Sequence, residues 1–185
     1  MPRVARIVVP GAPHHVIQRG NNRQDVFFVE DDRRAYLDFL AEQSEQYGLS
    51  LLAYCLMTNH VHLLLTPTDE TGISRLLQHV GRLYVLYINK TYRRSGTLWE
   101  GHFRSCLTQE EDYLRACQRY IELNPVRADT VDHPAEYRWS SYRHHAFGIT
   151  DKLLVAHEQY GRLGSSDEER QRAYRELFRT ELESR

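Results

Sequence analysis

The sequence predicts an α+β fold: an antiparallel sheet with helices on one face, a further helix on the other face, and a helical tail. Three observations indicate this class. Two short apolar segments, 49–57 and 60–66, are separated only by a short break at Thr58-Asn59, which makes them neighbouring antiparallel strands. Segment 72–92 repeats apolar residues with the 3.6-residue period of a helix. A further strand pattern and a further helical pattern follow it.

The first half of the chain contains three strand patterns and one helical pattern. Residues 14–19 are predicted to form the first strand. A helix begins at Asp31, and Gly48 supplies the stop signal after it. Residues 49–57 are almost continuously apolar, as expected for a strand buried on both faces, and Pro67 ends the strand at 60–66.

The second half contains a helix, a strand and another helix. After the 72–92 helix and a break at 94–96, residues 98–107 are predicted to form a strand. Segment 108–111 matches a capping box that opens the next helix, and Asn124-Pro125 closes that helix. The order β-α-β-β-α-β followed by a helix is a ferredoxin-like (RRM-like) arrangement, whose sheet has one open face.

The predicted organisation is one domain over residues 1–145 and a helical C-terminal tail over 146–185. The aromatic-rich segment 137–147 is expected to pack back on the domain, with stacking on nucleic-acid bases as the alternative. A polar break at 161–165 precedes a last helix, which Ser166 caps with Glu169 three residues later.

The composition is that of a soluble cytoplasmic protein. There is no apolar run near 18 residues and no signal-peptide pattern, so we expect neither export nor a membrane partner. The three cysteines, Cys55, Cys106 and Cys117, lie in apolar surroundings without a C-x-x-C motif and are expected to be reduced core residues.

The net charge of −1 does not by itself indicate a nucleic-acid binder, but the charge distribution does. Between residues 75 and 104 there are six Lys or Arg against one acid, Glu100. Such a local patch attracts phosphates even in a neutral chain, and we expect it to lie near the active site. The alternative is a solvated helix face. The predicted DNA-binding residues are Arg75, Arg82, Arg93, Arg94, Arg104 and His102.

Two short motifs predict the chemistry. His60 and His62 are one residue apart on a predicted strand, so their imidazoles share a face. Tyr120 and Asn124 are four apart on a predicted helix and also share a face, together with Tyr113. His60, His62 and the Asn124 amide oxygen could bind a divalent Mg²⁺ or Mn²⁺, beside which Tyr120 could attack a phosphodiester. Tyr113 is the rival nucleophile.

The segments that contain these motifs resemble the motifs of a known family. The matching segments are Pro2 to Arg6 with His14 to Gln24, Ala53 to Leu64 around Asn59-His60-Val61-His62, Gly96 to Ser105, and Tyr120 to Ala128. Over roughly residues 1–145 the chain resembles the single-tyrosine HUH transposases (the insertion-sequence-200-like class), and more narrowly the REP-associated tyrosine transposases. Insertion-sequence enzymes usually have glutamine where this chain has Asn124, whereas the REP-associated group has asparagine.

The resemblance implies cleavage and rejoining of single-stranded DNA with a nearby hairpin, through a covalent 5′-phosphotyrosine. Homodimerisation is left open. Two other classes of function remain: a ferredoxin-like nucleic-acid-binding module without catalysis, and a hydrolytic metal-dependent phosphodiesterase in which Tyr120 is structural.

Overall fold

A computed structural model describes residues 7–108 and 111–183. Parts of the first matching segment and of the predicted capping box lie outside these ranges. The four strands form one antiparallel sheet in the order β2-β3-β1-β4. The elements are β1 (His14–Arg19), η1 (Asn21–Arg23), α1 (Glu30–Gln46), β2 (Leu49–Leu56), β3 (His60–Pro67), α2 (Gly72–Thr91), β4 (Arg104–Leu107), α3 (Glu111–Glu122), α4 (Asn124–Arg127), η2 (Pro134–Glu136), α5 (Tyr142–Phe147), α6 (Glu158–Gly161) and α7 (Asp167–Glu183). The predicted α+β class is confirmed.

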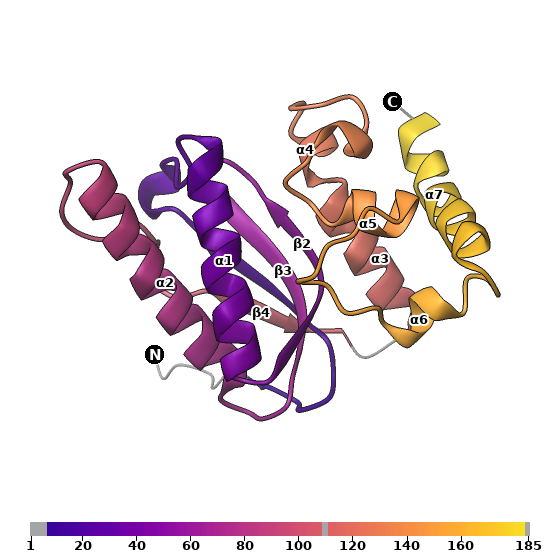
Figure 1. The fold of residues 1–185 in the computed structure, drawn as a ribbon, viewed down its shortest axis with the longest axis horizontal. Helices are drawn as coiled ribbons and strands as arrows, with labels where there is room; N and C mark the ends of the chain where they lie inside the picture. The colour runs from indigo at the N-terminus through magenta and orange to yellow at the C-terminus, as the bar shows by residue number, and fades with distance from the viewer. Residues whose placement is uncertain (1–6, 109–110, 184–185) are drawn as a thin grey trace.

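The sheet separates two helical layers (Figure 1). Helices α1 and α2 cover one face, while α3 and the C-terminal helices lie on the other. The sheet interior is apolar on both faces: Leu63, Leu64 and Leu65, three successive residues of β3, are all fully buried. Helix α3 packs on β2 and β3, so the face that holds the two histidines is only partly open.

Strand β4 is much shorter than predicted. The sequence predicts a strand over 98–107, but only Arg104–Leu107 pairs regularly with β1. Gly101 has a φ of +42°, in the left-handed region, and this interrupts an extended strand. Trp99 still forms an isolated antiparallel bridge with Gly20, so the segment before the turn follows the edge of β1.

The Asn124-Pro125 pair does not end the helical path. Helix α3 ends at Glu122, and the short helix α4 begins at Asn124. Pro125 lies in the first turn of α4, where its missing N–H leaves no helical hydrogen bond unmade. The predicted end of this helix at Asn124-Pro125 is therefore confirmed, although a separate short helix follows directly.

The C-terminal segments pack on Leu123 and α4 through a second apolar cluster. It comprises Leu123, Val126, Tyr142, Ala146, Tyr174 and Phe178. Tyr137, Trp139 and Tyr142 are buried, as predicted for the aromatic-rich segment, and the Tyr137 hydroxyl donates to the Leu56 carbonyl at 2.6 Å. The backbone N–H of Glu169 donates to the Ser166 hydroxyl at 3.2 Å, which confirms the predicted cap of α7. The division at residue 145 stays a prediction.

The sequence predicts that all three cysteines are buried, and the structure confirms this for two of them. Cys55 and Cys117 are buried, but Cys106 is exposed because it lies on the edge strand β4. None of the helices in the described ranges is long and apolar enough to span a membrane.

Candidate active site

Strand β3 brings His60 and His62 to the face of the sheet that α3 covers. Their ring centroids are 4.9 Å apart, as the period-two alternation predicts. β1 lies beside β3 with Ile17 opposite His62 and Arg19 opposite His60. The side chains of His15, Ile17 and Arg19 therefore share the face of the two histidines.

Hydrogen bonds fix which ring nitrogens are available. The Asn59 amide nitrogen donates to the Arg23 carbonyl, so the amide oxygen, 2.6 Å from Nδ1 of His60, is the acceptor. His60 therefore carries its hydrogen on Nδ1 and presents a lone pair on Nε2. Nδ1 of His62 lies 2.9 Å from Nε2 of His15, and Nε2 of His62 is buried without a hydrogen-bond partner among the described residues.

The surroundings keep these imidazoles neutral. Burial, followed by the charge of Arg19, lowers the pKa of His60 to about 4. Burial and then the neighbouring His60, His15 and Arg19 lower the pKa of His62 to about 2. Burial alone lowers the pKa of His15 to about 4. Metal ligation requires deprotonated imidazole, so the pair is in its binding form at neutral pH.

Helix α3 places Tyr120 against the histidines. Its ring centroid lies 5.9 Å from that of His62 and 6.0 Å from that of His15, both in edge-on contacts. The side chain is 41% exposed, so a substrate can reach it. The guanidinium carbon of Arg127 lies 4.8 Å from the Tyr120 ring centroid, a cation–π contact that orients the ring.

Asn124 is turned toward its own helix. Its amide nitrogen donates to the carbonyls of Tyr120 and Ile121, at 2.9 and 3.4 Å. These bonds satisfy carbonyls at the end of α3, where the helix leaves them without partners. Within the described ranges, no cluster of three or more His, Cys, Asp or Glu is arranged to hold a metal. A third protein ligand from Asn124 beside the two histidines would require the Asn124 side chain to rotate.

A buried acid anchors helix α3 to the C-terminal helices. Glu122, two residues past Tyr120, is fully buried. Its carboxylate accepts hydrogen bonds from the Ser141 hydroxyl at 2.5 Å and the Tyr174 hydroxyl at 2.6 Å, and lies 3.0 Å from Nδ1 of His145. Helices α3, α5 and α7 thus meet at a single carboxylate.

We expect Glu122→Ala to lower the free energy of unfolding by at least about 3 kcal/mol, because it leaves several buried polar groups without a partner. Urea unfolding measures this loss. The matched control is Glu181→Ala, which removes ion pairs to Arg119 and Arg127 at partly exposed positions. That variant should lose less than about 1 kcal/mol. Equal losses would show that Glu122 is not the anchor.

The predicted DNA-binding residues do not lie together. Arg75 and Arg82 lie on α2, which covers the face of the sheet opposite the histidines, and Arg93 and Arg94 follow the end of that helix. Their position follows from α2 burying its apolar stripe on the sheet and leaving its charged side chains in solvent. Of the six, Arg104, which lies opposite Ile17, and the neighbouring His102 line a cavity beside β1, and the DNA-binding role of all six stays a prediction.

Sequence reasoning missed His15, Arg19 and Arg127. The alternation within 14–19 already places His15, Ile17 and Arg19 on one face of a strand. What was missing was the pairing of β1 with β3, which brings that face beside the histidines. Arg127 falls within the matching segment at Tyr120–Ala128, but no local signal indicates its contact with the tyrosine ring.

Comparison with known proteins shows the family of this chain. The family model described as "Transposase IS200 like" matches residues 9–124, more than half of the chain. This protein belongs to the IS200-like transposase family. A Haemophilus influenzae protein named as a REP-associated tyrosine transposase is 23% identical over 126 residues, covering 62% of this chain and 69% of its relative. A solved structure of a REP-associated tyrosine transposase bound to a REP hairpin covers 85% of this chain and 93% of its own, with 15% identity and a TM-score of 0.68.

Membership confirms the resemblance derived from the motifs and makes the protein an enzyme of the transposase class. The matched region contains His60 and His62 and ends at Asn124, so it includes these three residues and Tyr120 but not Arg127. The structural match confirms the fold.

Proposed function

We propose that this transposase cleaves and rejoins single-stranded DNA through a covalent 5′-phosphotyrosine on Tyr120. One observation carries the proposal: two neutral imidazoles with free Nε2 atoms lie beside a half-exposed phenol. Neither Tyr120 nor the histidine pair would need to move far to contact the same phosphate.

The reaction is a transesterification. The Tyr120 oxygen forms a bond to phosphorus, the bond from phosphorus to the 3′ oxygen breaks, and the departing 3′-hydroxyl takes up a proton. The phenol proton passes to solvent, which reaches this side chain. Attack by a 3′-hydroxyl on the phosphotyrosine reverses the step without ATP, because the phosphodiester energy is kept in the covalent bond.

The residues present fit a divalent ion. His60 and His62 would hold Mg²⁺ or Mn²⁺ through Nε2, with Asn124 as an additional ligand after rotation. When bound, the ion withdraws charge from the scissile phosphate and orients it. His15 keeps His62 in place through the 2.9 Å bond between their ring nitrogens, the kind of outer contact that orients metal-binding histidines.

The proposed substrate is single-stranded DNA that carries a hairpin. The solved relative bound to a REP hairpin supports this substrate class. Exposed Arg75, Arg82 and Arg93 on the far face could contact DNA outside the cleavage site, since a hairpin extends well beyond one phosphate. A DNA substrate leads us to expect action in the cytoplasm, and a homodimer remains an expectation.

The two other classes of function fit the structure less well. An RNA-recognition module reads bases on an open sheet face, but here Cys55 and Leu64 on that face are fully buried. A hydrolytic phosphodiesterase needs no tyrosine near its metal ligands, whereas Tyr120 contacts His62 directly.

The test is a denaturing gel with labelled single-stranded oligonucleotides carrying a hairpin, incubated with Mn²⁺ or Mg²⁺. We expect label that stays attached to the protein after denaturation, together with a shortened strand ending in a 3′-hydroxyl. Cleavage without any attached label would show hydrolysis and contradict the proposal.

A further inference from the structure

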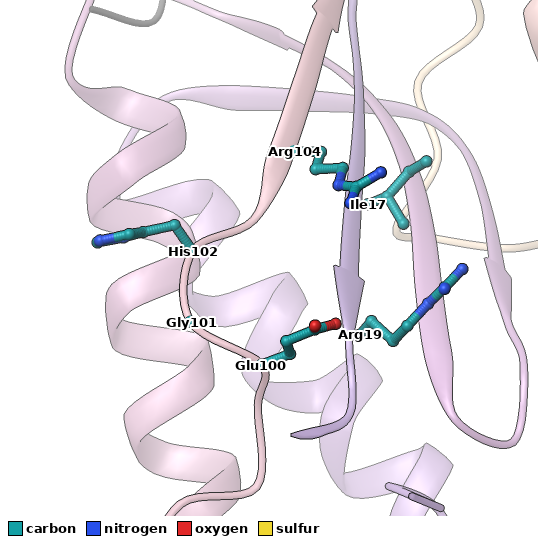
Figure 2. Close-up of a pocket in the computed structure, with 6 residues that line it drawn as sticks. All are labelled: Ile17, Arg19, Glu100, Gly101, His102 and Arg104. Atoms are coloured by element: carbon teal, nitrogen blue, oxygen red, sulfur yellow. The ribbon is translucent and has the colours of Figure 1, made fainter. Parts of the chain in front are cut away.

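A cavity of about 210 Å³ borders the candidate active site. Its walls are formed by Ile17, Arg19, Glu100, Gly101, His102 and Arg104 (Figure 2). It lies where β1 passes the segment that precedes β4, at the part of the sheet that α3 leaves uncovered.

The strand register places this cavity next to the two histidines. On one row across the sheet, Ile17 lies opposite His62 on one side and opposite Arg104 on the other. On the next row, Arg19 lies opposite His60. The cavity is therefore within reach of a nucleotide next to a phosphate that lies at the histidines.

The chemistry of the walls suits one nucleotide. Two guanidinium groups can pair with a phosphate, and Ile17 provides an aliphatic floor for a base. Figure 2 shows Glu100, Arg19 and Arg104 extending to the same side, whereas His102 extends away from them. The backbone N–H of Glu100 donates to the Arg19 carbonyl at 2.7 Å, which holds the backbones of these two residues together.

We propose that this cavity binds the nucleotide adjacent to the scissile phosphate and selects its base. Arg19 and Arg104 bind a phosphate of that nucleotide. The Glu100 carboxylate accepts a hydrogen bond from an exocyclic amino group, which cytosine, adenine and guanine have and thymine lacks. The proposal rests on the proposed function, and it identifies the substrate feature that the site reads.

The experiment selects bound strands from a random single-stranded DNA pool and sequences them, using protein in which Tyr120→Phe prevents covalent capture. In that background we expect thymine to be depleted at one position by at least about fivefold. Adding Glu100→Ala should remove this depletion while leaving the salt dependence of binding unchanged. Depletion that persists in the Glu100→Ala protein would overturn the base-reading role.

Arg19→Ala and Arg104→Ala should each weaken binding and reduce the slope of log affinity against log salt by about 0.7, the value for one phosphate of single-stranded DNA. Arg19→Lys should retain most of the slope. The matched control is Arg172→Ala. Arg172 is an exposed residue of α7, and it is distant in sequence from all the residues that line the cavity. Slopes equal to that of the control would overturn the phosphate role.

Failure of the cavity proposal is distinguishable from failure of the proposed function. The Arg172→Ala control should bind single-stranded DNA, and it should form the covalent adduct when Tyr120 is present. If it does both and the cavity variants give the same results as this control, only the cavity assignment is wrong. If single-stranded DNA does not bind to the control protein, both are wrong. Equal urea midpoints for all variants verify that they fold.

Discussion

Tyr120→Phe is expected to abolish the covalent protein–DNA band, because it removes the one oxygen that attacks phosphorus. The ring remains, so its edge-on contacts with His62 and His15 and the cation–π contact with Arg127 are retained. We therefore expect folding and DNA binding to stay nearly unchanged. The denaturing gel described above measures the band, and filter binding measures the affinity.

Tyr113→Phe is the matched control, since Tyr113 lies on the same helical row and is 49% exposed. Its hydroxyl lies 3.9 Å from the Cys106 sulfur, at the β4 end of α3, rather than beside the histidines. Its hydrogen bond with Cys106 raises its pKa above the usual value, which makes it a poorer nucleophile. An adduct that survives Tyr120→Phe but not Tyr113→Phe would reverse the assignment.

The second large effect concerns the metal. The double variant His60→Ala/His62→Ala should lose calorimetrically detectable Mn²⁺ binding, because it removes both neutral imidazoles with available Nε2 atoms. The matched control replaces two histidines elsewhere, His79→Ala/His144→Ala, whose rings bond the carbonyls of Arg75 and Ile149. That protein should bind Mn²⁺ like the wild type.

Asn124→Ala should weaken metal-dependent cleavage less than either single histidine change. Its amide nitrogen donates to two carbonyls at the end of α3. The side chain must give up those hydrogen bonds before its amide oxygen can bind the metal. Equal Mn²⁺ affinity for wild type and the double histidine variant would contradict the metal site as a whole.

The sequence determined much of this protein. The unbroken apolar run at 49–57 and the alternation that follows it determined two neighbouring strands, and with them the shared face of His60 and His62. Helical spacing determined the stripe of α2. These features depend on neighbours within one element or one hairpin, where spacing alone sets which side chains share a face.

The tertiary structure decided which elements face one another. Pairing of β1 with β3 brought His15 and Arg19 to the site, although more than forty residues separate them from His60 and His62. The packing of α2 on the opposite face carried Arg75 and Arg82 away from it. Glu122 found its partners only when α5 and α7 folded back on α3. Such contacts join residues far apart in the chain, and local periodicity contains no information about them because it specifies a face but not its partner.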